Sequence, residues 1–565
     1  MSTNFVFVTG GVLSGLGKGI TTASVGLILK SKGFKVTAMK IDPYVNYDAG
    51  TLRPTEHGEV WVTDDGGEID QDLGHYERFL NQDIGKDHNI TTGQVYGEVI
   101  RRERAGEYLG QTVQPIPHIT DEIKRRIHAV AERTGTDIVM IEIGGTVGDY
   151  ENILFLEAAR QMKLAGEPVL FVHVVYMPVL RSVGEAKTKP IQHSVRELNG
   201  YGIQPDFIVV RSEQPIDQPR RNKIALFCNV KDDEIIDNHD VRSVYEVPLV
   251  LESQGVGDKL LAKLGLEARQ SDLSEWRAFI DRMYNAPRSV RIGIVGKYFD
   301  VGDYKLPDAY VSVIEAIKHA AVANDAKAEI VWLDSKDYER NPEAVKNLAE
   351  YDGIIVPGGF GSSGVEGKIN AIKFVRENKI PYLGLCYGLQ LAVVEFARNV
   401  CGLAGAHTTE CDPNTKEPVI DFLPWQKELI ARKEYGGTMR LGGQTTIVKP
   451  GTLAHDVYGK DRIRERFRHR YEINPRYIER LTAAGFVFSG YADARHTHGE
   501  PVMQIGELPR DVHPFFCGSQ FHPELCSRPL RPNPLYVGFI AASAERANGK
   551  PGERRSAQEE FYPRP

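Results

Sequence analysis

The sequence has little of what marks secreted or membrane proteins. Its 565 residues include only six cysteines and no CxxC pair, which is too sparse for a disulfide framework in a chain of this length. Apolar runs such as 168–176 are far shorter than the ~20 residues that a membrane span needs, and Met1 leads into a strand-like segment without a signal peptide. We therefore expect a cytoplasmic protein in a reducing compartment, with no membrane partner.

Excess positive charge and repeats are also lacking. Lys and Arg number 69 against 76 Asp and Glu, a net charge of −7, so there is no basic footprint for nucleic acid. Small anionic ligands are the expected partners, because a local basic site for phosphates is compatible with this balance. No internal repeat or long low-complexity segment is present, which excludes solenoid and fibrous proteins.

Two series of alternating strand-like and helical segments predict a two-domain α/β protein. The first series has strand-like runs at 5–9, 35–39, 137–143, 169–176 and 207–210. The second has them near 290–295, 329–333, 353–356, 381–385 and 515–521. The segment 285–289 breaks the pattern between them. We predict domains at 1–270 and 290–546, a linker at 271–289 and a mobile tail at 547–565, where apolar residues are too few to offset the cost of ordering.

A glycine-rich loop follows the first strand. The run 5–9 leads into 10–19, which contains Gly15, Gly17 and Lys18, and good helix sequence follows from Ile20. Backbone N–H groups and a helix N-terminus form an anion site there, and the lysine can reach the β- and γ-phosphates. The pattern departs from the strict form in its spacing and in having Gly19 where Ser or Thr is expected, so the hydroxyl that would bind magnesium is not identified. The alternative is an ordinary tight turn.

Acidic residues near this loop suggest a metal. In 68–72 a continuous extended segment would put the carboxylates of Glu68, Asp70 and Asp72 on one face. Glu142 lies in an apolar run, where an unpaired carboxylate is costly to bury. We favour Asp72 and Glu142 as Mg²⁺ ligands, since magnesium accepts one or two carboxylates plus phosphate. For Glu68 and Asp70 a solvated edge is the open alternative, and a solvated face is the default interpretation of the lysine cluster at 187–192.

The second domain carries a candidate nucleophile. Gly384-Leu385-Cys386-Tyr387-Gly388 ends a strand and enters a helix, the form of a nucleophile elbow with cysteine in the serine position. His522, after a later strand, is the candidate base and Glu524 its orienting group. The loop 357–361 could supply oxyanion N–H donors. Taken singly, Cys386 could be a buried structural thiol and His522 a core histidine.

Over nearly the whole chain these residues resemble the CTP synthase family. Further stretches that carry the resemblance are 39–44, 57–60, 73–79, 142–149 and 468–472. The resemblance implies a P-loop-type parallel-sheet amidoligase domain followed by a class I glutamine amidotransferase domain of flavodoxin-like α/β fold. It implies glutamine-dependent, ATP-driven amination of UTP to CTP.

The resemblance also implies roles for individual residues. ATP would be bound by Gly15, Leu16, Gly17, Lys18, Gly19, Ile20, Lys40, Asp72, His239, Asp240 and Val241. UTP, or CTP as feedback inhibitor, would be bound by Ser14, Asp149, Tyr150, Glu151, Lys187, Thr188, Lys189, Pro190, Ile191, Gln192 and Lys223. Glutamine would be bound by Gly359, Tyr387, Gly388, Leu389, Gln390, Glu410 and Arg470, with Cys386, His522 and Glu524 as the catalytic triad. Mg²⁺ would be held by Asp72 and Glu142.

Two positions depart from the family pattern. Ile191 stands where threonine is frequent, and His239 where lysine is common, which could alter nucleotide affinity. The resemblance further implies GTP as allosteric activator, a homotetramer and filament formation. Two alternatives stay open: an ATP-dependent amidoligase with another acceptor, and a filament-forming regulatory nucleotide binder without catalysis.

Overall fold

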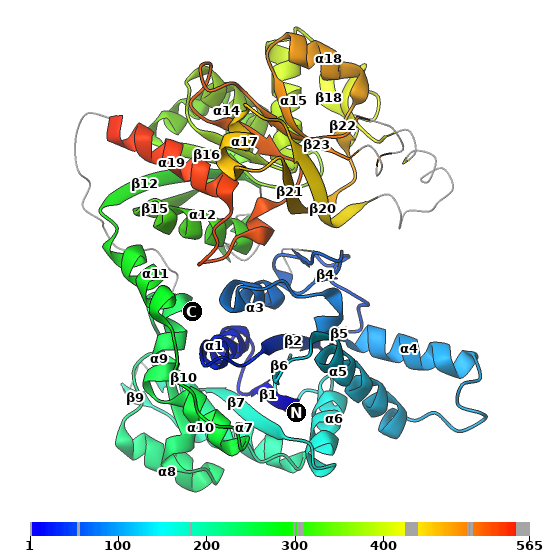
Figure 1. The fold of residues 1–565 in the computed structure, drawn as a ribbon, viewed down its shortest axis with the longest axis vertical. Coiled ribbons are helices and arrows are strands. Elements are labelled where there is room, and N and C mark those ends of the chain that lie inside the picture. Colours follow the sequence, from blue (N-terminus) through cyan, green and yellow to red (C-terminus); the bar gives the residue numbers. More distant parts are fainter. Residues whose placement is uncertain are drawn as a thin grey trace.

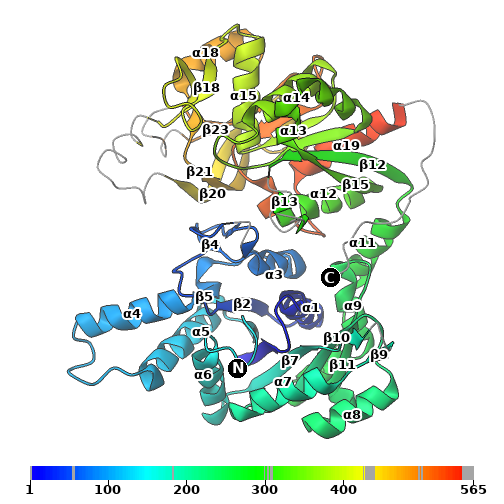
Figure 2. The same cartoon turned by 180° about the vertical axis from the view of Figure 1, so that it is seen from behind.

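The chain forms two α/β domains, one above the other in Figures 1 and 2. A computed structural model describes residues 3–53, 57–180, 184–297, 300–301, 304–305, 310–423, 426, 439–493, 497 and 501–549. The predicted tail lies outside the described residues from 550 onward, and 547–549 end the last helix. In the described part of the chain, no helix is long and apolar enough to cross a membrane.

The first domain is built on a fully parallel seven-stranded sheet, in the order β11-β10-β7-β1-β6-β2-β5. Its strands are β1 Asn4–Gly10, β2 Val36–Asp42, β5 Asn89–Thr91, β6 Ile138–Ile143, β7 Val169–Tyr176, β10 Phe207–Ser212 and β11 Ile235–His239. Short strand pairs are β3 Trp61–Val62 with β4 Glu68–Ile69, and β8 Val179–Leu180 with β9 Glu185–Ala186. The helices are α1 Lys18–Ser31, α3 Asp72–Leu80, α4 Thr92–Arg104, α5 Thr120–Thr134, α6 Ile153–Leu164, α7 Lys189–Gly200, α8 Gln218–Cys228, α9 Val247–Ser253, α10 Val256–Lys263 and α11 Ser274–Asn285.

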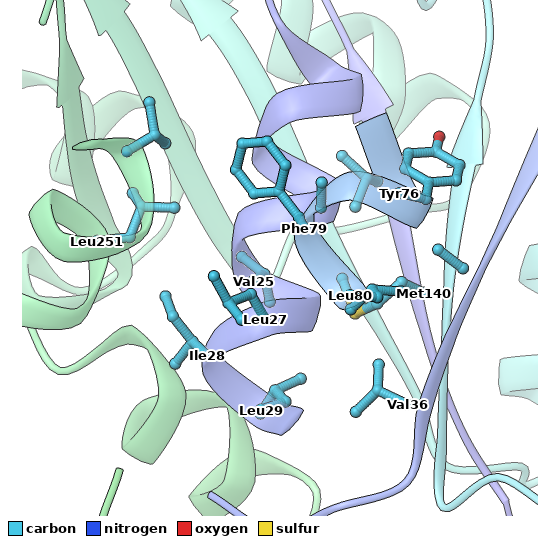
Figure 3. Packing of buried hydrophobic residues seen from close by; sticks show 14 of the residues in the cluster. Val25, Leu27, Ile28, Leu29, Val36, Tyr76, Phe79, Leu80, Met140 and Leu251 are labelled. Carbon is cyan, nitrogen blue, oxygen red and sulfur yellow. The ribbon is translucent and has the colours of Figure 1, made fainter. Parts of the chain in front are cut away.

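Helices on both faces explain why the central strands are apolar along their whole length. Every residue of β1, β2 and β6 is buried, as expected for parallel strands covered on two sides. Figure 3 shows α1 and α3 packing Val25, Leu29 and Leu80 together with Met140 of the sheet. A Cβ on Gly26 would lie 3.1 Å from Cδ2 of Leu80, so glycine lets the two helices approach. This packing fixes α1 beneath the glycine-rich loop.

The second domain has a nine-stranded mixed sheet, in the order β15-β12-β16-β17-β25-β24-β23-β20-β21. Its strands are β12 Arg288–Gly296, β15 Ala326–Asp334, β16 Gly353–Val356, β17 Tyr382–Leu385, β20 Arg440–Val448, β21 Arg462–His469, β23 Val487–Ala492, β24 Met503–Glu507 and β25 Phe516–Ser519. The first five in sheet order are parallel and the rest antiparallel. Smaller strands are β13 Asp300–Val301, β14 Tyr304–Lys305, β18 Ala406–Thr408, β19 Glu417–Asp421 and β22 Glu472–Ile473. The helices are α12 Val311–Ala323, α13 Ser335–Arg340, α14 Val365–Glu377, α15 Tyr387–Asn399, α17 Leu453–Tyr458, α18 Pro475–Ala483 and α19 Pro534–Gly549.

The segment predicted as a linker contains helix α11. Trp276 of this helix is buried and donates its indole N–H to the main-chain oxygen of Tyr245 at 2.8 Å. The Tyr245 hydroxyl in turn donates to Glu315 of α12 at 2.5 Å. The connection between the domains is therefore packed against both of them.

A buried ion cluster joins the domains directly. Glu77 of α3 is buried, and its carboxylate pairs with Arg466 of β21 at 2.9 Å and with Arg528. Asp83 accepts from both guanidinium groups at 3.1 Å. Arg466 also lies 5.4 Å from the ring centroid of Trp61. Both ribbon views place α3 and β4 next to the second domain, as these contacts require (Figures 1 and 2).

We expect Glu77→Ala to destabilise the protein by roughly 3 kcal/mol, because it leaves two buried guanidinium groups without their shared carboxylate. Urea unfolding would measure the loss. The matched control is Glu132→Ala, which removes an exposed helical glutamate of α5 and should change stability little. Equal effects of the two substitutions would contradict this role for Glu77.

Candidate functional sites

The glycine-rich loop lies between β1 and α1, as the sequence predicted. Gly15 and Gly17 have φ of +75° and +78°, and Gly17 caps α1 in the left-handed conformation. A Cβ on Gly10 would lie 2.6 Å from Cδ of Lys18, so glycine leaves room for the lysine to fold over the loop. Lys18 Nζ donates to the main-chain oxygen of Gly145 at 3.0 Å. Burial lowers the pKa of Lys18.

The strand register brings the two candidate metal ligands to one lysine. Lys40 of β2 lies opposite Glu142 of β6, and its Nζ donates to the Glu142 carboxylate at 2.7 Å and also pairs with Asp72. Tyr76 donates its hydroxyl to the other oxygen of Glu142. A Cβ on Gly19 would lie 2.5 Å from Oδ1 of Asp72. The glycine that departs from the strict phosphate-loop pattern therefore makes room for this carboxylate.

The electrostatics of this cluster follow from burial and from Lys40. Burial raises the pKa of Glu142 even though Lys40 opposes the shift. Burial alone would raise the pKa of Asp72, but the nearby charges of Lys40, His75 and Lys18 outweigh burial and lower it. Asp42, which the sequence reasoning missed, also faces Lys40 and accepts from the amide of Asn89 at 2.6 Å. Its signal was its place at the end of β2, two residues after Lys40.

These oxygen donors fit Mg²⁺. Asp72 and Glu142 supply hard carboxylate oxygens beside the N-terminus of α1, which is the donor set magnesium takes when phosphates complete its shell. Among the described residues there is no group of three or more His, Cys, Asp or Glu with metal-binding geometry. The assignment of Asp72 and Glu142 as ligands stays a prediction.

The acidic run at 68–72 does not form one extended face. β4 ends at Ile69 and α3 begins at Asp72, so the three carboxylates point to different partners. Glu68 pairs with Arg468 at 2.8 Å, Asp70 lies 3.7 Å from His57, and Asp72 contacts Lys40. The chain turns here because Asp70 accepts the N–H of Asp72 at 2.8 Å and starts the helix.

A cavity of about 470 Å³ lies beside the glycine-rich loop. Its lining is Val12, Thr146, Val147, Gly148, Pro190, His193, Ser194 and Glu197. Of the predicted UTP/CTP residues, Pro190 lines it and the exposed 149–151 follow Gly148 directly, while Ser14 is exposed at the tip of the loop. The cavity is therefore bounded by the loop, by the turn after β6 and by α7 from Pro190 to Glu197.

The remaining predicted nucleotide residues have mixed surroundings. Lys187 pairs with Glu185 at 2.5 Å and is the main cause of the lowered pKa of that carboxyl group. Lys223 is exposed, and its charge contributes to the same shift. Gln192 donates to Thr188 at 3.1 Å, Lys189 is exposed and Ile191 is fully buried. The contact between Gln192 and Thr188 and the burial of Ile191 hold the start of α7 in place.

The segment 239–241 lies at the end of β11, next to α1. The amide of Asn238 contacts the Thr21 hydroxyl at 3.5 Å, which brings the strand end beside the helix. His239 pairs with Asp237 at 3.0 Å, Asp240 accepts from Arg211 at 2.8 Å, and Val241 packs on the core around α1, as do Leu16 and Ile20. The segment is therefore near the loop, as an ATP-binding role requires.

The nucleophile elbow is formed as predicted. Cys386 separates β17 from α15 with φ +49° and ψ −96°, a strained conformation for a residue with a side chain. A Cβ on Gly388 would lie 2.2 Å from the main-chain oxygen of Val356, and one on Gly384 would lie 2.8 Å from Gly388. The two glycines are therefore required for the sharp turn, and the Cys386 N–H donates to Ser519 at 2.6 Å.

His522 and Glu524 are placed for a triad with Cys386. The two side chains lie 2.7 Å apart, between Nδ1 and Oε1. Burial alone would lower the pKa of His522, but Glu524 and the Cys386 thiol raise it well above its ordinary value. Gln520, which the sequence reasoning did not single out, donates its amide to the Cys386 sulfur at 3.6 Å. A thiolate beside a charged imidazole is the pairing that a cysteine nucleophile needs.

A cavity of about 300 Å³ opens onto this triad and is lined by both domains. The second domain contributes Tyr310, Val313, Gly358, Gly359, Phe360, Cys386, Gln390, Glu410, Met439, Arg468, His469, Arg470, Tyr471, His522, Glu524 and Leu525, and the first contributes Glu59, Val60 and Val62. Four of the predicted glutamine residues therefore line it: Gly359, Gln390, Glu410 and Arg470.

The other predicted glutamine residues support the cavity wall. Tyr387 donates its hydroxyl to the main-chain oxygen of Gly361 at 3.0 Å, and the Gly361 N–H donates to Glu410 at 2.7 Å. Gly388 and Leu389 are buried in α15, and Leu389 packs in the core. These contacts hold the glycine loop 358–361 over the nucleophile.

Arg468 is a further residue that the sequence reasoning did not assign. Its main-chain oxygen lies 3.9 Å from the Cys386 sulfur, and its guanidinium donates to Glu68 of the first domain at 2.8 Å. The only sequence signal was its place in the motif 468–472. One residue therefore contacts both the nucleophile and the other domain.

Lys368 of α14 lies under the glycine loop. It is 1% exposed, and its Nζ has no hydrogen-bond partner among the described residues. It sits 5.4 Å from the ring centroid of Tyr387 and 3.7 Å from where a Cβ on Gly359 would be. Burial, together with the charge of Lys297, lowers the pKa of Lys368 to about 7.

This depressed pKa makes stability depend on pH. Between pH 7 and 10.5 the unfolded chain binds a proton that folded Lys368 does not, so the penalty on folding is full below pH 7 and vanishes as pH rises through 10.5. We expect Lys368→Met to raise the Tm by on the order of 5 °C at pH 7, and by much less at pH 9.5. Thermal unfolding at both pH values measures this, with exposed Lys373→Met of the same helix as control. A gain independent of pH would contradict the assignment.

One domain holds a phosphate-type loop with paired acids, and the other holds a Cys-His-Glu site. Together these two sites define a glutamine-dependent ligase. The family model for the CTP synthase N-terminus matches residues 4–266, and that for class-I glutamine amidotransferase matches 305–542. The chain belongs to the CTP synthase family.

Two relatives that match over nearly their whole length support this assignment. The chain is 55% identical to the CTP synthase of Thermococcus gammatolerans, over 97% of this chain and 100% of that one. It is 56% identical to the CTP synthase of Pyrococcus abyssi, over 96% and 98%. A solved structure, the glutaminase domain of Trypanosoma brucei CTPS with bound acivicin, matches 45% of this chain and 94% of its own at 36% identity and a TM-score of 0.41.

The predictions of family, enzyme class and two-domain α/β fold are confirmed by these matches. The two alternatives, an amidoligase with another acceptor and a regulatory binder without catalysis, are not favoured by them.

Proposed function

We propose that the chain makes CTP from UTP, ATP and L-glutamine, in the synthesis of pyrimidine nucleotides. The observation that carries this is the cavity at Cys386, because its wall reaches Glu59, Val60 and Val62 of the nucleotide-binding domain. A glutaminase site that opens only to solvent would not need residues of another domain. We also propose the domain boundaries 1–270 and 290–546, with α11 between them.

At the nucleotide site, the uracil O4 has to be made a leaving group. Transfer of the ATP γ-phosphoryl group to O4 does this. Ammonia then adds to C4 and loses a proton as the C–N bond forms, and the phosphate leaves with the C4–O4 bond electrons. Lys18 and Lys40 lie where they can neutralise charge on the phosphates. Mg²⁺, when bound by Asp72 and Glu142, would supply further positive charge at the β- and γ-phosphates. The residues predicted for ATP and UTP are proposed in these roles.

At the second site, the Cys386 thiolate attacks the amide carbon of glutamine. A thioester forms, and the proton held by His522 goes to the departing nitrogen, which leaves as ammonia. Water then hydrolyses the thioester to glutamate and restores the thiol. Glu524 keeps the imidazole oriented through the 2.7 Å contact, and the N–H groups of the loop 358–361 are proposed to hold the oxyanion.

The ammonia has to reach C4 of UTP without being protonated, because ammonium cannot attack. We infer an enclosed path that starts in the cavity at Cys386. Its walls on the side of the first domain are Glu59, Val60 and Val62. We also propose that the path passes His57 of the motif 57–60, which is not among the described residues that line the cavity.

The regulatory properties rest on the family resemblance. We propose feedback inhibition by CTP at Asp149, Tyr150 and Glu151, which are exposed beside the cavity of about 470 Å³. We further propose activation by GTP, a homotetramer that can assemble into filaments, and a cytoplasmic location.

The first experiment measures CTP formation from UTP, ATP and Mg²⁺ with either glutamine or ammonium at alkaline pH. We expect Cys386→Ala to lose the glutamine-dependent reaction by about 10³-fold or more and to keep the ammonium-dependent one. The control is Cys228→Ala, which removes a buried thiol in α8 of the first domain. A wild type that makes no CTP from either nitrogen source would overturn the proposed function.

The converse separation is expected at the nucleotide site. Glu142→Gln removes a buried charge that pairs with Lys40, so CTP formation from either nitrogen source should fall by at least about 10²-fold, while Cys386 still hydrolyses glutamine. Exposed Glu132→Gln is the control. Unchanged CTP formation in Glu142→Gln would contradict its role.

A further inference from the structure

Glu59 belongs to the first domain but reaches into the second. It follows Gly58, whose φ of +78° turns the chain just before β3. A Cβ on Gly58 would lie 2.7 Å from the amide oxygen of Gln71, so glycine is needed for the turn. The turn aims the Glu59 side chain across the domain boundary, towards the beginning of α12.

The Glu59 carboxylate is held there by one residue. Its Oε2 accepts the N–H of Ser312 at 2.9 Å and also the Ser312 hydroxyl. Ser312 is in the first turn of α12, where backbone N–H groups lack helical partners and a negative charge is favourable. Glu59 therefore supplies both a missing acceptor and a charge to the helix of the other domain.

This contact is part of the cavity wall. Glu59, Tyr310 and Val313 all line the cavity that contains Cys386, so the residues on both sides of Ser312 face it. The glutamate is not in the triad, although burial and the nearby Glu524 raise its pKa to about 7 against the opposing effect of Ser312. Its carboxylate oxygen is used for the contact between domains.

The other contacts across the boundary do not substitute for it at this point. Arg468 pairs with Glu68, and Glu77 pairs with Arg466 and Arg528. These belong to β21 and to the segment after the triad, whereas Glu59 is bonded to Ser312 in the first turn of α12. Tyr245 holds the same helix at Glu315, further from the cavity. Loss of the Glu59 contact would therefore release the first turn of α12, between Tyr310 and Val313, while Tyr245 and the arginine contacts keep the helix and the domains docked.

We propose that Glu59 is a positioning residue that closes the α12 side of the ammonia path by holding Ser312 against the nucleotide-binding domain. This rests on the proposed function, since it assigns a role in the coupling of its two reactions. Without the contact, ammonia made at Cys386 escapes to solvent and is protonated before it reaches UTP. The chemistry at each site remains intact.

The test is the number of CTP molecules formed per glutamine hydrolysed, in wild type, Glu59→Ala, Glu59→Gln and Ser312→Ala. In Glu59→Ala we expect this ratio to fall about fivefold or more, since a hydrogen bond to a charged group is lost. Glutamine hydrolysis and ammonium-dependent CTP formation should each stay within about twofold of wild type. Glu59→Gln keeps a carbonyl acceptor for the Ser312 N–H and should restore most of the coupling.

The outcomes separate this inference from the function on which it rests. Ser312→Ala keeps the backbone N–H and should show an intermediate ratio, and exposed Glu132→Ala should show the wild-type ratio. A wild-type ratio in Glu59→Ala, or an ammonium-dependent reaction that falls in parallel, would overturn the role of Glu59 alone. A wild type that makes no CTP from either nitrogen source would overturn the proposed function, and this inference with it.

Discussion

The buried pairing of Glu77 with Arg466 and Arg528 is the constraint on which the rest of the structure depends. A buried ion cluster contributes little net stability, because desolvation offsets much of the attraction. It is, however, intolerant of misalignment, since a displaced partner leaves a charge unpaired in a dry interior. The cluster therefore specifies how the two domains sit against each other.

This constraint is transmitted to the triad through a single strand. The main-chain oxygen of Arg466 accepts the His522 N–H at 2.8 Å, so the residue that docks on Glu77 also positions the imidazole. Two residues further along β21, Arg468 places its main-chain oxygen 3.9 Å from the Cys386 sulfur and its side chain on Glu68. Docking of the domains and alignment of the triad are thus properties of the same strand.

The sequence predicted the central parallel strands and missed the antiparallel ones, for a physical reason; it also missed β5 and β11 at the two edges of the first sheet. Strands such as β1 and β6 are buried on both faces, and their apolar runs stand out in the sequence. β21 has four arginines and a glutamate in eight residues, because alternate side chains leave the core and meet the first domain. Its strand character is set by its neighbour β20 and by Glu77 and Glu68, which are about 400 positions away.

The same division applies to the sites. Features within one local motif were predictable: the glycine loop before α1, the elbow at Cys386, and His522 with Glu524 two residues later. Pairings between motifs were not, because they depend on sheet order and register. Lys40 meets Glu142 only because β2 and β6 are neighbours, and Arg468 and Glu59 have no local pattern that marks a contact across domains.

The two buried lysines show why each site needs its own surroundings. Lys40 is held between Asp72 and Glu142, which raise its pKa well above the ordinary value despite burial, so it stays charged in the cluster proposed to bind phosphates. Lys368 has no such partner among the described residues, and burial lowers its pKa. The two lysines therefore differ because Asp72 and Glu142 contact Lys40 directly, whereas no described residue forms a hydrogen bond with Nζ of Lys368.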